Sequence, residues 1–214
     1  QDLPVAWTPT NGVDYNANST FGSGDNLGSN TFAVSETTGS GFTVTGLTPA
    51  TTYHFSVFEF NGSSSNTFYL TTPAQVLTGS VTTLSPPSVS AGNFVFTNIT
   101  GYNATVTFTA GNGARRLVLA KAGSPVTDVP VNLVNYTSNT NYPTAPTFGT
   151  SKIVYDGGGT TFDLQSLQPN TAYHFAIFEY NGSGGPVFKQ ADPGLGSFIT
   201  LGKPTVSPTN LTYS

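Results

Sequence analysis

Histidine and glutamate, two side chains often used for acid–base chemistry, recur at matching positions in this sequence. His54 is followed by Glu59, and His174 is followed by Glu179 at the same spacing. These are the only 2 histidines, and they lie 120 positions apart. A catalytic triad or a metal cage needs several such groups together, and an odd spacing within a strand puts two side chains on opposite faces. We therefore expect structural roles and predict no catalytic residues.

Acidic residues beside glycine suggest a second chemistry, calcium binding. Asp25-Asn26 lies in a glycine-rich stretch, and Asp156 precedes the triglycine Gly157–Gly159. Neither has the spacing of a calcium loop, and no Lys-Ser/Thr follows the triglycine to make it a phosphate cradle. Asp, Asn and Gly favour turns, so we predict turns at both places, with a hairpin at the triglycine. No metal site and no cofactor are predicted.

Aromatic side chains in and after the long polar connection from Gly123 to Phe148 are the third candidates. Tyr136 and Tyr142, with Tyr155 beyond them, could form a platform that stacks against sugar rings. We take Tyr136 and Tyr142 as candidate ligand contacts. The alternative is that these rings pin the connection to the domain, because a tyrosine buries its ring while its hydroxyl stays hydrogen-bonded.

The composition narrows the classes of partner. The 214 residues carry a net charge of −4, only 7% are charged, and the 6 basic residues are scattered. A nucleic-acid partner is therefore disfavoured. No apolar run approaches the roughly 20 residues that span a bilayer, so membrane insertion is not expected. With Cys 0, no disulfide framework forms.

The element that positions the histidines and glutamates occurs twice in the sequence. The stretch Leu47–Gly62 returns as Leu167–Gly182 at a constant offset of 120. In both copies apolar residues alternate as in a strand with one face on a core, and Asn-Gly closes the stretch as a turn. Such self-similarity predicts repeated copies of one domain.

The domain organisation follows from this repeat and from the diproline Pro86-Pro87, which cannot pair within a sheet. Residues 1–85 are predicted to be the C-terminal part of a first β-sandwich repeat. Residues 86–202 form a complete second repeat, and residues 203–214, which match Pro86 onward, begin a third. Short strands are expected in the first repeat at Thr31–Val34 and Gly41–Val44.

The first repeat has no counterpart of Asn93–Ala120. Half a sandwich exposes unpaired edges, which proteins normally avoid. We therefore expect that the chain is one part of a longer array of repeats. The alternative is an incomplete sandwich that receives the missing strands from a neighbouring chain.

The run Leu-x-Pro-x-Thr-x-Tyr, present at Leu47 and again at Leu167, resembles the approach to strand F of the fibronectin type III family. The resemblance implies an all-β chain of tandem fibronectin type III-like, immunoglobulin-like sandwiches. It also implies that Tyr53 and Tyr173 are tyrosine corners, each with its hydroxyl tied to upstream backbone.

A wider pattern, which includes Arg115-Arg116-Leu117 and the ending Glu-Tyr-Asn-Gly, resembles repeats of very large secreted surface proteins of Bacteroidetes-type bacteria. This resemblance implies an extracellular or cell-surface location and a non-enzymatic role as spacer, filament or adhesin. The partners would be neighbouring repeats, copies of the chain itself or surface polysaccharide. Two alternatives stay open: a carbohydrate-binding accessory module of a secreted hydrolase, and a strand-donating polymer subunit.

Overall fold

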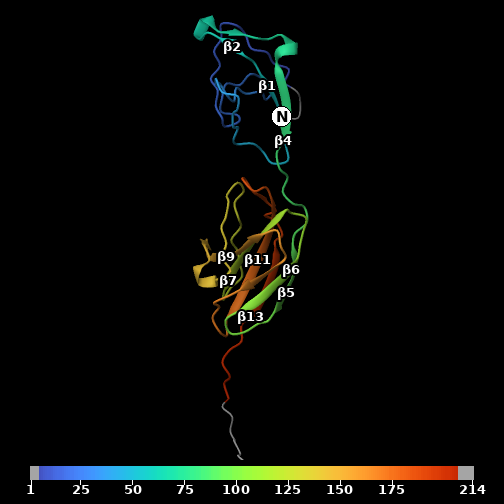
Figure 1. Ribbon diagram of the computed structural model, residues 1–214, viewed down its shortest axis with the longest axis vertical. Helices are drawn as coiled ribbons and strands as arrows, with labels where there is room; N and C mark the ends of the chain where they lie inside the picture. The colour runs from blue at the N-terminus through green and yellow to red at the C-terminus, as the bar shows by residue number, and fades with distance from the viewer. Residues whose placement is uncertain (1–4, 207–214) are drawn as a thin grey trace, which may run out of the picture. The chain divides into compact units, whose positions relative to one another are not determined.

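A computed structural model describes residues 5–206 (Figure 1). The chain divides into two compact units, Gln1–Ser85 and Pro86–Ser214, called unit 1 and unit 2 below. Most of the predicted start of a third repeat, residues 207–214, lies outside the described residues, as do residues 1–4. Within the described residues, no helix is long and apolar enough to cross a membrane.

Unit 2 is a sandwich of two antiparallel sheets. One sheet has the strand order β10-β6-β5, and the other has the order β12-β11-β7-β9-β8 with β13 paired to β11. This is the fibronectin type III-like arrangement that the sequence predicts, and the fold class is confirmed. The elements are β5 (Gly92–Thr97), β6 (Ala104–Thr109), β7 (Arg115–Ala122), the 3-10 helix η3 (Tyr142–Thr144), β8 (Thr147–Phe148), β9 (Ser151–Gly157), β10 (Thr161–Leu164), β11 (Ala172–Asn181), β12 (Val187–Phe188) and β13 (Gly194–Ile199).

The strand β11 is central to unit 2. It pairs with β7 on one edge and with β13 on the other. Phe175 and Ile177 point into the core between the sheets, while Ala176 and Phe178 point to the opposite face. All four are buried, so the expectation of one core face is wrong for this strand.

The second face of β11 is buried because the long connection lies over it. Val126, Tyr136 and Phe148, all from this connection, pack against the apolar cluster on that face. The polar connection therefore acts as a third layer, which explains why aromatic residues recur in a stretch otherwise rich in turn formers.

The triglycine Gly157–Gly159 does not close a hairpin. It joins β9 to β10, and these strands belong to different sheets. The predicted turn exists, but it carries the chain from one sheet to the other. A hairpin would require β9 and β10 to pair, and β9 instead pairs with β7 and β8.

Unit 1 has far fewer strands than unit 2. The strand β1 (Thr52–Val57) pairs with β4 (Leu77–Thr82), and β2 (Phe60–Asn61) pairs with β3 (Phe68–Tyr69). Two 3-10 helices, η1 (Ser64–Asn66) and η2 (Pro73–Gln75), lie between these strands.

The strands expected at residues 31–34 and 41–44 do not form. Phe32 and Thr45 make only isolated bridges in this region. In unit 2 the matching residues form β9 and β10, which pair with β7 and β6. Unit 1 has no counterpart of β6 or β7 among its described residues, so these segments have no strand to pair with.

Several hydrogen bonds of unit 2 recur at matching positions in unit 1. The Thr51 N–H donates to the Thr83 hydroxyl at 3.0 Å, and the Thr171 N–H donates to the Thr200 hydroxyl at 2.9 Å. The hydroxyls of Thr83 and Thr200 in turn donate to the carbonyls of the residues before Pro49 and Pro169.

The same recurrence fixes the register of the N-terminal stretch. Tyr15 accepts a hydrogen bond from the Thr10 N–H, and Tyr136 accepts one from the Val131 N–H. Thr10 therefore corresponds to Val131, an offset of 121. Residues 128–131 thus match residues 7–10.

Candidate functional site

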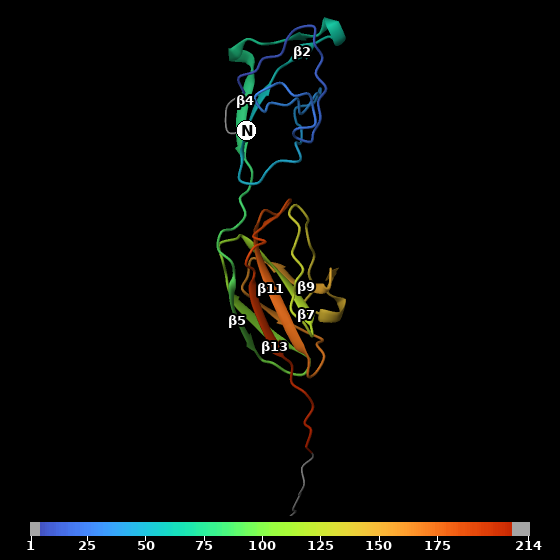
Figure 2. The same cartoon turned by 180° about the vertical axis from the view of Figure 1, so that it is seen from behind.

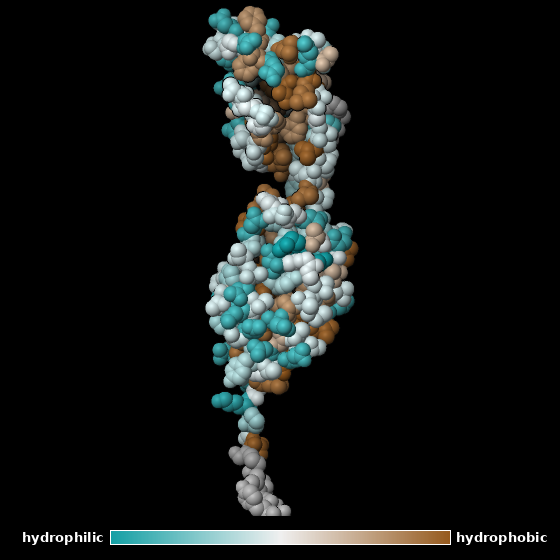
Figure 3. Space-filling model, viewed as in Figure 1, coloured by the Kyte–Doolittle hydropathy of each residue, from teal (hydrophilic) through white to brown (hydrophobic). Residues whose placement is uncertain are grey.

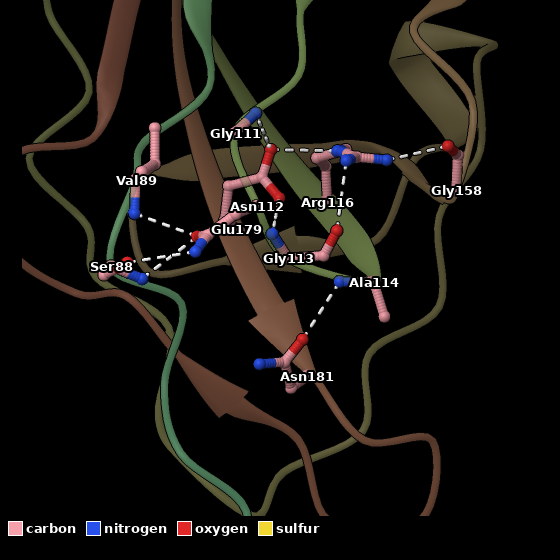
Figure 4. Close-up of polar contacts among 10 residues, drawn as sticks. All are labelled: Ser88, Val89, Gly111, Asn112, Gly113, Ala114, Arg116, Gly158, Glu179 and Asn181. Carbon is pink, nitrogen blue, oxygen red and sulfur yellow. Dashed lines mark hydrogen bonds and ion pairs between the residues drawn. The ribbon is translucent and has the colours of Figure 1, made fainter.

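A buried ion pair is the strongest polar feature of unit 2 (Figure 4). Glu179 on β11 lies directly opposite Arg116 on β7, and Arg116 Nε donates to Glu179 Oε1 at 2.9 Å. The same carboxylate accepts from the N–H groups of Gly111 at 2.7 Å and Gly113 at 2.9 Å. The side chain of Glu179 is fully buried. This carboxylate therefore serves the loop between β6 and β7 and is closed to solvent.

The remaining donors of Arg116 are used inside the protein as well. Its guanidinium donates to the carbonyls of Gly158 at 2.7 Å and Gly113 at 3.1 Å (Figure 4). A buried pair is tolerated when its remaining lone pairs and protons are satisfied. Arg116 and Glu179 thus tie the β6–β7 loop, the triglycine crossover and β11 together, and neither is free to act on a substrate.

Two asparagines extend this cluster, Asn112 towards the segment after the diproline and Asn181 towards the start of β7 (Figure 4). Asn112 Oδ1 accepts from the N–H groups of Ser88 and Val89 at 3.0 and 2.9 Å. Asn181 Oδ1 accepts from the Ala114 N–H at 3.0 Å. The segment that follows Pro86-Pro87 is therefore held to the sandwich by side chains.

A partly open hollow of about 320 Å³ lies on the outer side of the larger sheet. Several polar and aromatic side chains of unit 2 face this space together. Arg115 Nε donates to the Tyr180 hydroxyl at 2.7 Å, and the Tyr180 hydroxyl donates to Asp156. Arg115 Nη2 also lies 3.2 Å from Asp156 Oδ1. The lining residues are Arg115, Leu117, Asn135, Tyr136, Asp156, Tyr180, Ser183, Pro186 and Phe188.

Burial and hydrogen bonding shift the ionisation of these groups. Burial is the main reason that the pKa of Tyr180 rises to about 12, and the hydrogen bond to Asp156 adds to it. The hydrogen bond to Tyr180 and the charge of Asp156 raise the pKa of Arg115. The hollow thus presents the guanidinium of Arg115, the phenol of Tyr180 and the side chain of Asp156, which suit hydrogen bonding to a polar neutral ligand.

The tyrosines of the repeated stretch bond to upstream backbone. Tyr53 accepts from the Thr48 N–H and Tyr173 accepts from the Gln168 N–H, both at 2.9 Å. Both rings are buried, at 2% and 1% exposed. A hydroxyl bonded in this way fixes the loop before the strand. These tyrosines therefore have a structural role.

The two candidate ligand contacts lie in different places. Tyr136 lines the hollow and packs edge-on against Phe148 and Phe188. Tyr142 packs edge-on against Tyr173 at 5.0 Å and accepts from the Ala122 N–H at 3.0 Å. Burial raises the pKa of Tyr142. Both rings are half-buried, so they pin the connection to the sandwich and do not form an exposed platform.

The sequence does not predict the two arginine sites. Arg115 and Arg116 contribute only to a resemblance, and Glu179 is a candidate only beside His174. In the structure His174 lies opposite Lys121 and Ser197 instead. The sequence holds one signal of a buried ion pair. The glutamate recurs at the same repeat position, in a chain that has only 6 basic residues.

The part of the chain that the structure describes contains no cluster of metal-binding side chains. No group of at least three His, Asp or Glu side chains there comes close enough to hold a metal ion. Asp25, a candidate calcium ligand, accepts hydrogen bonds from the backbone N–H and side chain of Asn16. This contact joins two segments nine positions apart, and the turn-type contact belongs to the next residue, Asn26, whose Oδ1 accepts from the Gly28 N–H at 2.9 Å.

Comparisons in sequence find no match with a known protein family or with a curated protein. Comparisons in structure find fibronectin type III domains and related sandwiches. A redesigned β-sandwich protein matches at 21% identity with a TM-score of 0.36, over 59% of this chain and 99% of its own. The sixth fibronectin type III domain of a human protein matches at 14% identity with a TM-score of 0.36, over 58% of this chain and 95% of its own.

Domains d3-d4 of the extracellular region of rat CD45 match over more of the chain. The identity is 17% and the TM-score 0.37, over 94% of this chain and 81% of that one. The strand order and register of unit 2, described above, carry the fold assignment.

Proposed function

We propose that this chain is a non-enzymatic structural repeat region of an extracellular, cell-surface adhesin or filament, in which sandwich units act as spacers. The observation that carries the proposal is the recurrence, in unit 1, of the backbone-to-side-chain bonds of unit 2. Chains that repeat a module in this way use it to add length. The partners would be neighbouring repeats or copies of the same chain.

The path of the chain through unit 2 supports a spacer. The chain enters at one pole, after the diproline, and leaves at the opposite pole, beyond β13 (Figures 1 and 2). Tension applied at the ends would therefore run along the strands. Because strand hydrogen bonds lie across the strand direction, such tension loads many of them at once.

Single-molecule pulling tests the spacer role. The chain is held by its two ends, and we expect unit 2 to resist and then to unfold in one sudden step. The Phe175→Ala variant, which opens a cavity in the core, should unfold at a lower force. Smooth extension without a step would contradict the proposal.

Labelling of intact cells by an antibody against unit 2 tests the surface location.

A carbohydrate-binding module is the second candidate, because the hollow combines Tyr136 and Tyr180 with Arg115 and Asp156. Aromatic rings that face a space beside hydrogen-bonding groups suit a sugar ring. Polysaccharide binding that is lost in Tyr136→Ala and kept in Tyr102→Ala, at an exposed tyrosine of unit 2, would favour this function. No binding to any polysaccharide would count against it.

A further inference from the structure

Unit 1 leaves one edge of its main strand without a partner. In unit 2, β11 pairs with β13 on one edge and with β7, along Tyr173–Tyr180, on the other. The counterpart of β11 in unit 1 is β1, and its counterpart of β13 is β4. No strand occupies the β7 position beside β1 in the described residues. That edge presents free N–H and C=O groups, which favour the addition of a strand.

Apolar side chains of unit 1 are exposed where their counterparts are buried. Val57 is 39% exposed and Val81 is 51% exposed, while the matching Ile177 and Phe198 of unit 2 are at 0% and 8%. Phe42, the counterpart of the buried Phe162, is also exposed. Figure 3 shows apolar side chains gathered on the surface of unit 1. An apolar face of this kind marks a surface that another segment covers.

Two carboxylates of unit 1 identify the chemistry of that segment. Glu59 is the counterpart of Glu179, and it is exposed, with no side-chain hydrogen bond or ion pair among the described residues. Glu36 is the counterpart of Asp156 and is exposed as well. In unit 2 the matching carboxylates pair with Arg116 and Arg115, which are adjacent in sequence.

We propose that unit 1 binds a three-stranded polypeptide segment of the kind formed by residues 88–122, whose third strand begins with two arginines. This third strand pairs antiparallel with β1, as β7 pairs with β11. Its second arginine, with two N–H groups of a glycine loop, binds Glu59, and its first arginine pairs with Glu36. The first two strands cover the apolar face. The inference rests on the proposed function, because it takes both units as copies of one module.

Fusion of the segment to the whole chain gives the test. The offset of 121 makes Gln1 the counterpart of Ala122, so a copy of residues 86–121 is placed directly before Gln1. The fusion holds the segment at high effective concentration. Amide hydrogen exchange is then measured in Thr52–Val57, and we expect it to slow at least about 100-fold relative to the unfused chain.

Variants separate the proposed pairing from nonspecific collapse. In the fused protein, Glu59→Gln or Arg116→Met in the copy should reverse the protection of β1 by about 100-fold in the opening equilibrium, because each breaks a buried pair. Glu36→Gln is the matched control, because it removes the exposed pair. It should change the opening equilibrium of β1 less than about fivefold. In the unfused chain Glu59→Gln should change nothing.

Three results would overturn the inference. The first is unchanged exchange of β1 in the fused protein. The second is an equal effect of Glu59→Gln and Glu36→Gln. The third is an unfused chain that is already a dimer with β1 protected, since a second copy would then cover this face. If unit 1 closes but unit 2 extends smoothly under force, only the proposed function fails.

Discussion

At the scale of single residues, the polar side chains of unit 2 act on the protein itself. Glu179 binds two loop N–H groups and Arg116, and Tyr173 binds backbone five positions upstream. Asp128 behaves in the same way. Burial alone would raise its pKa, but hydrogen bonds from Ser151 and Thr150 outweigh burial and lower it. Polar groups engaged in this way hold loops in place.

Loss of the buried arginine should cost far more stability than loss of its exposed neighbour. We expect Arg116→Met to lower the free energy of unfolding by about 3–5 kcal/mol, because Glu179 stays buried without its counter-ion. Arg115→Met is the matched control. Its side chain is 42% exposed, and the expected loss is about 1 kcal/mol or less. Urea unfolding measures both, and equal losses would contradict the assignment of roles.

Alkaline pH should destabilise unit 2 through Tyr180. Its pKa is about 12 in the folded protein and near 10 when exposed, so the folded state holds the proton more tightly. The contribution is complete below pH 10 and is lost as the pH rises towards 12. The free energy of unfolding should fall across this range, and less steeply in Tyr180→Phe. An identical slope in both proteins would show that Tyr180 does not titrate in this way.

At the scale of elements, the two sheets of unit 2 differ in their outer faces. The connection from Gly123 to Phe148 covers the outer face of the larger sheet, where Ala176 is 1% exposed. The outer face of the smaller sheet is open, and Val95 on β5 is 54% exposed. The connection is thus part of the core of the domain, despite its polar composition.

A charge placed on each outer face should reveal this difference. We expect Ala176→Glu to lower the free energy of unfolding by about 3 kcal/mol or more, because the carboxylate has no partner under the connection. Val95→Glu should change it by about 0.5 kcal/mol at most, since the new charge stays in water. Denaturant unfolding compares the two. A small effect of Ala176→Glu would mean that the connection lifts away readily.

At the scale of the whole molecule, the two units differ in how much of a core they contain. Both apolar clusters that the structure describes consist entirely of unit 2 residues. In unit 1, Tyr53 and Thr67 are among the few buried side chains, and several apolar residues are exposed. Stability therefore resides mainly in unit 2.

Removal of unit 1 should leave the main thermal transition in place. We expect residues 86–206 alone to melt cooperatively, within about 4 °C of the main transition of the whole chain, because a larger shift would require more than about 1 kcal/mol. Differential scanning calorimetry compares the two. Loss of the transition in the shorter protein would mean that unit 1 supplies part of the core.

The sequence by itself determined the local features of this protein. The repeat of Leu47–Gly62 at Leu167–Gly182 predicts that Tyr53 and Tyr173 hold matching positions in a strand, and they lie in β1 and β11. These features depend on neighbours in sequence, so a short window of residues contains the information.

Tertiary structure alone decided the features that depend on a partner strand. Residues 31–34 and 41–44 alternate as strands do, yet they form no strand because unit 1 has no counterpart of β6 and β7 among its described residues. Arg116 meets Glu179 only because β7 lies beside β11 in one register. Pairing between distant segments is a property of the assembled sheet, and no local pattern of residues contains it.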